Sequence, residues 1–204
     1  MTINQFKNSL KGGGARNNQF RVRGTFPNGG TGALGTILGA VGGAAGGDLG
    51  NLLGAAGNLL GLNSPAAQLE FLCKSASLPA STLGVVEVPY RGRTIKYPGD
   101  RSFMEWTITI VNDTDFGIRN AFEQWSDLIN SHVQNIGVSS LAQISQRWEI
   151  DQLGRDSSIL KTYSFEDCWP SEISQIDTSF DSNDSVEEFT VTMQVSYWTS
   201  NTTT

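Results

Sequence analysis

Hydrophobic and polar residues alternate along several stretches of the chain, a pattern typical of β-strands with one buried face. The strictest alternation runs over 186–198. Its apolar positions are Phe189, Val191, Met193, Val195 and Tyr197, and the residues between them, 190, 192, 194 and 196, are polar. This pattern predicts a half-buried strand. Weaker patterns predict further strands over 18–26, 68–74, 85–90, 93–97, 106–112, 147–152, 160–168 and 173–180.

One segment has the period of a helix instead. Its apolar stripe consists of Ile118, Phe122, Trp125 and Ile129, which are spaced i, i+4, i+7 and i+11. Such a stripe packs against a core. The polar residues 112–115 precede it and offer N-cap side chains with negative charge for the helix dipole. We therefore predict one amphipathic helix, in a region that Gly137 closes.

Glycine and proline indicate where the strands end. Arg91-Gly92 separates two predicted strands and predicts a hairpin turn. Leu78-Pro79 and Pro98-Gly99-Asp100 predict two further turns, and Trp169-Pro170 predicts the end of the strand before it. The sum is a mainly β (α+β) fold, an antiparallel β-sandwich or barrel with one packed α-helix.

The chain divides into an N-terminal arm, one β domain and a short tail. We place the arm at 1–17, the domain at 18–198 and the tail at 199–204. Residues 27–64 are rich in Gly, Ala and Leu and form an insertion in the domain. A membrane helix and a disordered linker are alternatives, but we favour an ordered insertion that packs small residues closely against neighbouring backbone. Residues 30–35 match G-x-G-x-x-G, without the strand and helix that a dinucleotide site needs.

Composition and charge narrow the function. The 204 residues are 38% hydrophobic and 17% charged, and the net charge is −6. This charge excludes a basic nucleic-acid binder. Residues 1–23 carry five bases and no acid, whereas residues 162–204 carry eight acids and no base. These are either ordinary solvated faces or the two ends of a polar subunit, whose basic arm meets an acidic surface on a neighbour.

The chain offers no set of residues for catalysis. Cys73, Cys168 and His132 are its two cysteines and its one histidine, which excludes a disulfide scaffold and a His- or Cys-rich metal site. We read both cysteines as buried thiols in a reducing compartment, because no secretory signal pattern opens the chain, and His132 as a helix-surface residue. Residues 181–184 resemble a calcium turn only weakly. We expect no enzyme, cofactor or metal.

Several segments together resemble a known family. They are Leu72-Cys73-Lys74-Ser75-Ala76-Ser77-Leu78-Pro79-Ala80, the run from Gly99-Asp100-Arg101 to Asn112-Asp113, Trp169-Pro170-Ser171-Glu172-Ile173, and the run from Phe180 to Trp198. Their order and spacing resemble the tail tube protein of contractile-tailed bacteriophages (myoviruses). The resemblance covers roughly 18–26 and 68–198. The insertion at 27–64 departs from it, since the family usually has a short connection there.

The resemblance implies a β-barrel-like subunit whose strands join between copies into a ring. Six copies would form each ring, and stacked rings would form a tube inside the contractile sheath. The implied partners are further copies of the chain, the sheath protein, the baseplate initiator, the tail terminator, and genomic DNA that passes through the lumen without specific binding. No membrane is implied. The implied location is the tail of the virion, with assembly in the host cytoplasm.

The resemblance and the charges together suggest contact residues. We expect the hairpin 85–97 to reach the adjacent ring, with Arg91, Arg93 and Lys96 as contacts, and Asp100 and Arg101 to fix a turn or a subunit contact. Acids that face the lumen would repel phosphates. Our candidates for these acids are Glu172, Asp177 and Glu187.

Two alternatives remain. One is the inner tube of a related contractile injection or secretion system. The other is a ligand-binding β-sandwich that uses the scattered aromatic residues Trp106, Trp125, Trp148, Trp169 and Trp198.

Overall fold

The computed structural model describes residues 2–10, 14–27, 65–138, 140–181 and 184–203. The insertion at 27–64, with its G-x-G-x-x-G match, lies outside the described residues apart from Pro27. The described elements, in chain order, are α1 (Ile3–Ser9), β1 (Phe20–Gly24), α4 (Pro65–Leu72), β2 (Cys73–Ala76), β3 (Ser81–Tyr90), β4 (Arg93–Phe103), β5 (Trp106–Val111), α5 (Gly117–Ile129), α6 (Leu141–Ile144), β6 (Gln146–Leu153), β7 (Ile159–Ile173), β8 (Glu188–Gln194) and β9 (Tyr197–Ser200).

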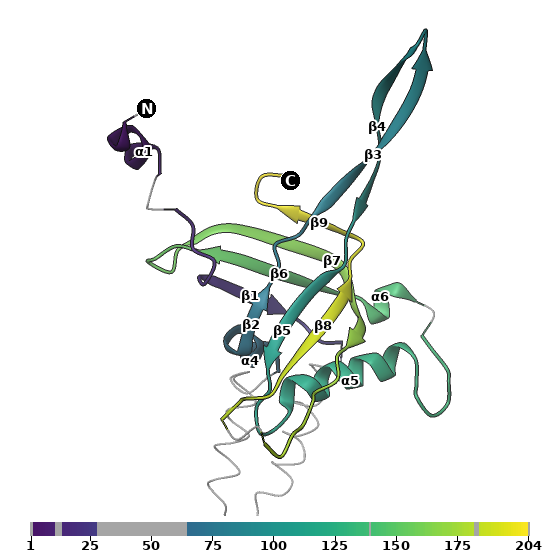
Figure 1. Ribbon diagram of the computed structural model, residues 1–204. Coiled ribbons are helices and arrows are strands. Elements are labelled where there is room, and N and C mark those ends of the chain that lie inside the picture. The colour runs from purple at the N-terminus through teal and green to yellow at the C-terminus, as the bar shows by residue number, and fades with distance from the viewer. Residues whose placement is uncertain (1, 11–13, 28–64, 139, 182–183, 204) are drawn as a thin grey trace, which may run out of the picture.

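The body is an antiparallel sheet in the order β1-β6-β7-β8-β5-β2, with β9 also paired to β7. Strand β7 links its two halves (Figure 1). Residues Ile159–Cys168 of β7 pair with β6, and Trp169–Ile173 pair with β8. Strands β3 and β4 form a separate two-stranded sheet. The mainly β, antiparallel fold class predicted from the sequence is therefore confirmed.

Aromatic side chains fill the space between the sheet and α5. The ring centroid of Phe26 lies 5.0 Å from that of Phe122 and 5.6 Å from that of Trp148, both in edge-to-face geometry. The rings of Trp106 and Phe165 stack at 4.2 Å. All five side chains are buried, so the alternating strands and the helical stripe contribute to one core.

Helix α5 is the predicted helix, and its first three stripe residues are buried. It begins at Gly117, because Phe116 before it adopts a left-handed backbone with φ 54°. The carboxylate of Asp113 accepts a hydrogen bond from the Gly117 amide at 3.1 Å, so an acid of the predicted cap cluster does stabilise the first turn. None of the described helices is long and apolar enough to cross a membrane.

The strand predicted over 68–74 is wrong. Helix α4 occupies most of this stretch, and only its end belongs to β2. Pro65 at the first helical position favours a helix start, and Leu69 is fully buried. A short apolar run is compatible with a strand or with a buried helix, which is why the pattern predicted a strand here.

Three strand boundaries near the C-terminus are also wrong. Strand β7 continues through Trp169-Pro170, because its register with β8 shifts at Pro170 and accommodates the missing amide. Residues 174–180, predicted as part of a strand, lie outside the strands of the described chain. The long strand over 186–198 is broken at Val195-Ser196, where the chain leaves β8 and pairs with a different part of β7 as β9.

Candidate subunit interface

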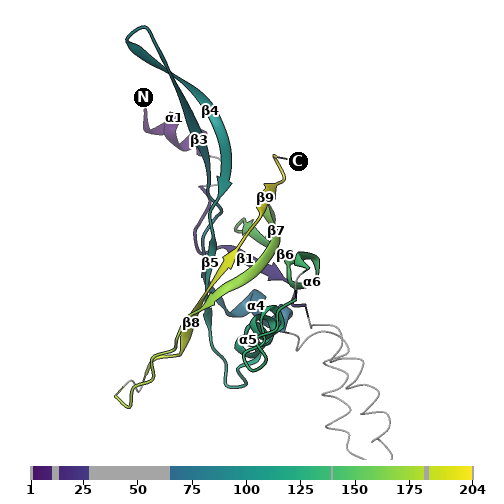
Figure 2. The ribbon, with the colours of Figure 1, turned by 90° about the vertical axis from the view of Figure 1, so that its right-hand side faces the viewer.

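The β3–β4 hairpin projects far from the body of the molecule (Figures 1 and 2). Its turn is the predicted Arg91-Gly92 pair, with φ angles of 46° and 88°. Two consecutive positive φ angles are what the tight two-residue turns of β-hairpins require. The hairpin is longer than predicted, since its register runs from the pair Ser81–Phe103 to the pair Tyr90–Arg93.

A β-bulge with two glycines kinks the hairpin. The register shifts between Leu83 and Val85, opposite Gly99. A Cβ atom on Gly99 would lie 3.1 Å from the carbonyl carbon of Gly84, so the two backbones approach too closely for side chains. The turn predicted at Pro98-Gly99-Asp100 is therefore wrong. These residues belong to β4, and Gly99 forms part of the bulge.

The outer part of the hairpin has one apolar face. Val86 pairs with Tyr97 and Val88 with Ile95, and side chains of opposed residues share a face. All four are exposed in the single chain; Val86 is 51% exposed and Tyr97 55%. The opposite face carries the ion pair between Lys96 and Glu87, whose charged atoms lie 3.3 Å apart. Exposed apolar sheet faces of this kind are typical of surfaces that another molecule covers.

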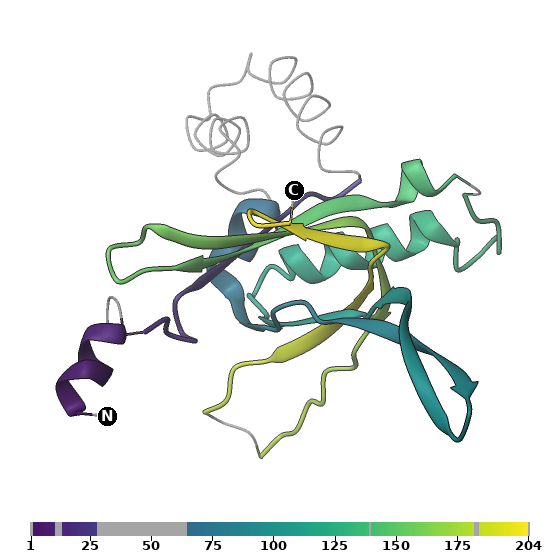
Figure 3. The same cartoon turned by 90° about the horizontal axis from the view of Figure 1, so that it is seen from above.

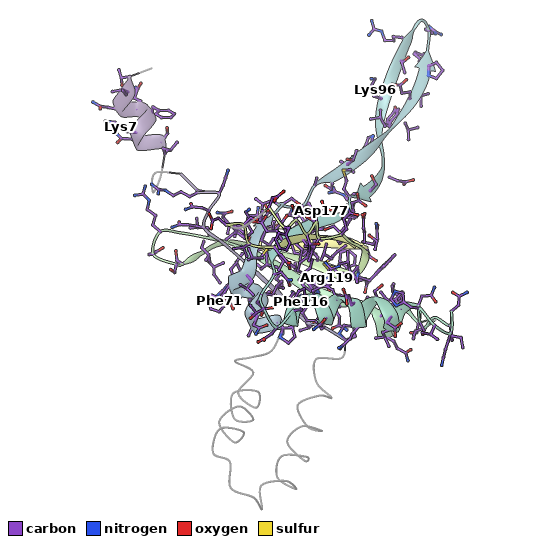
Figure 4. All side chains as sticks on the ribbon, turned by 60° about the horizontal axis from the view of Figure 1, so that its bottom comes forward. Lys7, Phe71, Lys96, Phe116, Arg119 and Asp177 are labelled. Carbon is purple, nitrogen blue, oxygen red and sulfur yellow. The ribbon has the colours of Figure 1, made fainter. Side chains whose placement is uncertain are left out.

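The predicted contact residues divide along the hairpin. Arg91, Arg93 and Lys96 lie at or near the tip, where the guanidinium of Arg91 lies 5.5 Å from the centroid of the Tyr90 ring. Figure 4 labels Lys96 on the projecting hairpin. Asp100 and Arg101 lie at its base, beyond the bulge, and Arg101 donates a hydrogen bond to Ser81 Oγ at 3.3 Å. The five residues therefore do not form one cluster.

The three acids proposed for the lumen lie at different places along β7, the segment after it and the position before β8. Glu172 lies near the end of β7, Asp177 in the segment after it, and Glu187 directly before β8. All three are exposed. Glu187 Oε2 accepts a hydrogen bond from Asn112 Nδ2 at 3.0 Å. The described residues between β7 and β8, 174–181 and 184–187, lie below the sheet in Figures 1 and 2, away from the hairpin.

Sequence reasoning missed a chain of alternating charges across β1, β6 and β7. Its centre is Asp151, whose side chain is fully buried. Asp151 Oδ2 lies 3.0 Å from Arg21 and 2.9 Å from Arg23, and Thr162 donates a 2.6 Å hydrogen bond to Oδ1. The outer members of the chain are Glu70, Glu149, Arg147 and Glu166. The only signal in the sequence was the R-x-R of β1 and the R-x-E-x-D of β6.

Two further exposed apolar regions flank the body. Helix α1 exposes Ile3 and Phe6 and is entirely exposed, and it lies near the same end of the molecule as the hairpin (Figure 3 shows it from above). The loop after α5 exposes Val133 and Ile136. His132 lies in this loop rather than on a helix surface, and its ring nitrogen Nδ1 lies 3.0 Å from Asp127.

An open groove lies between α5 and β7. Its volume is about 460 Å³, and its lining includes Arg119, Glu123, His132 and Glu172. Within the described residues no group of three or more His, Cys, Asp or Glu could hold a metal ion. Burial raises the pKa of Cys73 and of Cys168 to about 12, so both thiols stay protonated at neutral pH and are poor nucleophiles.

Comparison of the sequence with known proteins finds one family and several of its members. Residues 15–201 match the family described as phage tail tube protein. Tail tube protein gp19 of Enterobacteria phage T4 is 29% identical over 129 residues, which are 63% of this chain and 79% of gp19. The tail tube protein of Serratia phage KSP90 is 28% identical over 58% of this chain and 67% of its own length.

Solved structures share the fold at low sequence identity. A chain of the PVC sheath–tube complex, an extracellular contractile injection system, superposes with a TM-score of 0.53 at 13% identity, covering 98% of this chain and 97% of that one. A chain of the cap that terminates the anti-feeding prophage tube has a TM-score of 0.51 at 17% identity, with 63% and 78% covered. Because the family match covers most of its length, the chain belongs to the phage tail tube protein family.

Proposed function

We propose that this tail tube protein assembles into six-membered rings, and that the rings stack into the channel through which phage DNA leaves the virion. The observation that carries the proposal is the exposed apolar face of the β3–β4 hairpin. In a lone subunit this face would promote aggregation, whereas stacking against another ring covers it.

In this proposal the tip of the hairpin, with Arg91, Arg93 and Lys96, contacts the adjacent ring. Asp100 and Arg101, at the base of the hairpin, contact a neighbouring subunit or fix the base itself. Strands of neighbouring copies join within each ring, which satisfies their open edges. The hairpin supports this division of roles, because it projects beyond the body of its own chain (Figure 2).

The proposed lumen acids are Glu172, Asp177 and Glu187. A negative lumen repels the phosphates of DNA, so the genome slides through without binding. All three side chains are exposed, and no base lies between them along the chain. The domain limits 18–198, with arm and tail on either side, are part of the same proposal.

The role is structural rather than enzymatic. The tube lies in the virion tail inside a contractile sheath, begins on a baseplate initiator and ends at a terminator protein. The structures that share this fold come from assemblies with a sheath and a tube-terminating cap. We propose that the tube is assembled in the host cytoplasm.

The second candidate is the inner tube of a contractile injection system, which the likeness to the PVC chain favours. The two roles differ in the proteins that are attached to the tube. If the chain forms a phage tail tube, mass spectrometry of particles purified from the source would find capsid proteins. If it forms the inner tube of an injection system, mass spectrometry would find an injection apparatus without capsid proteins. A ligand-binding sandwich has less support, since three of the five tryptophans are buried in the core.

Negative-stain electron microscopy of the purified chain tests the proposal, with light scattering to follow its mass. We expect rings or hollow tubes, and six-fold symmetry in top views. A monomer that stays monomeric across concentration and salt, and does not polymerise on an added tail-tube initiator, would overturn it.

A further inference from the structure

The hairpin tip combines apolar groups with two arginines, Arg91 and Arg93, that form no ion pair with the described residues of their own chain. Arg93 pairs in register with Tyr90, so both side chains share the apolar face with Val88 and Ile95. Within the described residues, Arg93 has no ion-pair partner, and Tyr90 is 56% exposed. A surface of this composition fits an acidic partner that also offers apolar side chains.

The same chain carries such a surface at its other end. In the segment between β7 and β8, Phe180 is 101% exposed and Val186 is 67% exposed. Beside them lie Asp181 and Asp184, which are exposed and have no ion-pair partner within the described residues. The first acid after Asp184 that forms an ion pair is Glu188, which pairs with Lys74. The segment is therefore both acidic and apolar, as the hairpin tip is basic and apolar.

The two surfaces cannot meet within one molecule. The hairpin points to one end and the segment lies at the other, in both side views (Figures 1 and 2). A contact between unlike surfaces of identical chains does not close on itself in pairs but repeats in one direction. Along a stack, each ring would present acidic segments to the hairpins of the next.

Resting on the proposed stacking of rings, we propose that the hairpin tip of one copy docks on described residues of the 180–186 segment of a copy in the next ring. Four of these residues, Phe180, Asp181, Asp184 and Val186, form the seat. Arg93 faces Asp181 and Asp184, and the apolar face around Val88 covers Phe180 and Val186. Like charges would meet if one ring were inverted, so this contact also makes every ring point the same way.

Charge reversal in the full-length chain tests the contact. Arg93→Asp should shift the products from long tubes to single rings or short stacks, and should raise the concentration needed for tubes about tenfold. Asp184→Arg should do the same. Mixing the two variants, or combining both changes in one chain, should restore tubes, since each new acid then meets a new base. The matched control is Arg155→Asp, the same reversal at the exposed turn between β6 and β7.

Cross-linking gives a second readout that does not depend on charge. A chain with Arg93→Cys and Asp184→Cys should form disulfide-linked ladders of several copies on a non-reducing gel once tubes form. A chain with Arg155→Cys and Asp184→Cys should not. The native Cys168 is buried and Cys73 is half-buried, and because burial raises the pKa of both thiols to about 12 they compete little.

The outcomes separate the two proposals. If Arg93→Asp stops stacking but Asp184→Arg forms normal tubes and no ladder appears, the hairpin still joins rings and the 180–186 seat is wrong. If Arg93→Asp forms normal tubes, the docking of the tip is wrong. If the unaltered chain forms neither rings nor tubes on an initiator, the tube function itself fails. Rescue by the combined change supports the seat.

Discussion

At the scale of single residues, the carboxylate of Asp151 is the centre of the chain of charges across β1, β6 and β7. It is the fully buried member, and its partners Arg21 and Arg23 are 30% and 43% exposed. The hydrogen bond to Asp151 is the largest cause of the raised pKa of Arg21. The pairs bring together residues 128 and 130 positions apart in sequence, so they fix the register of β1 on β6.

Replacing Asp151 by Asn should destabilise the fold without abolishing it. The change removes the buried charge, while both guanidinium groups keep access to water. We therefore expect a loss of about 2–3 kcal/mol in the free energy of unfolding. Urea unfolding of the monomer measures it. In the control, Glu123→Gln breaks the exposed i,i+4 pair with Arg119 and should cost less than about 0.5 kcal/mol. Equal losses in the two variants would contradict this role of Asp151.

The buried thiol of Cys168 should make the fold sensitive to high pH. Burial raises its pKa to about 12, above the ordinary value of 9.0. Between these values the unfolded chain releases the proton and the folded chain keeps it, so the free energy of unfolding falls as pH rises. We expect Cys168→Ala to lose less stability than the unaltered chain between pH 9 and pH 12, as measured by urea unfolding. Identical pH slopes would show that Cys168 does not contribute.

At the scale of elements, the β3–β4 hairpin contributes no side chain to the core of the body. Its outer residues contact each other rather than the core, and the apolar groups on it are exposed. The core residues come instead from the main sheet, α4, α5 and the chain around Phe26. Changes in the hairpin should therefore impair assembly of the tube while the body still folds.

Replacing residues 85–98 by a two-residue Asn-Gly turn should leave the fold and remove the tube. The melting temperature should change by only a few degrees, because no core side chain is lost. Electron microscopy should show no stacked rings. Calorimetry and circular dichroism provide the folding control. A large loss of melting temperature, or normal tubes, would show that the hairpin has another role.

Sequence alone predicted the elements whose period and turn chemistry agree. The strand with Trp106, Ile108 and Ile110 and the stripe of α5 follow from the spacing of buried residues, and Arg91-Gly92 follows from the needs of a tight turn. The wrong predictions of secondary structure have local causes. The run 68–74 was short enough to suit either a helix or a strand, and a proline at a register shift does not stop β7.

At the scale of the whole molecule, the candidate interface was only partly predictable. The position of Arg91, Arg93 and Lys96 at or near a hairpin tip could be predicted because the turn and the charges are local in sequence, while their contact role stays a prediction. The apolar face could not be predicted, since it depends on the register between β3 and β4 and on its exposure beside the described part of the body. The partners of Asp151 were not found either, because strand patterns do not say which strands become neighbours.

Strand β7 gives the molecule a mechanical property. Its 15 residues have a contour length of about 50 Å, turn at Asp167 with φ 56°, and are bonded to β6, β8 and β9. A pull along its β6-paired part, Ile159–Phe165, would load many backbone hydrogen bonds at once, in shear, instead of opening them one after another. We therefore expect the body to resist stretching best along this part of β7, and force on a subunit to deform the hairpin at its Gly84–Gly99 kink before it separates the strands of the sheet.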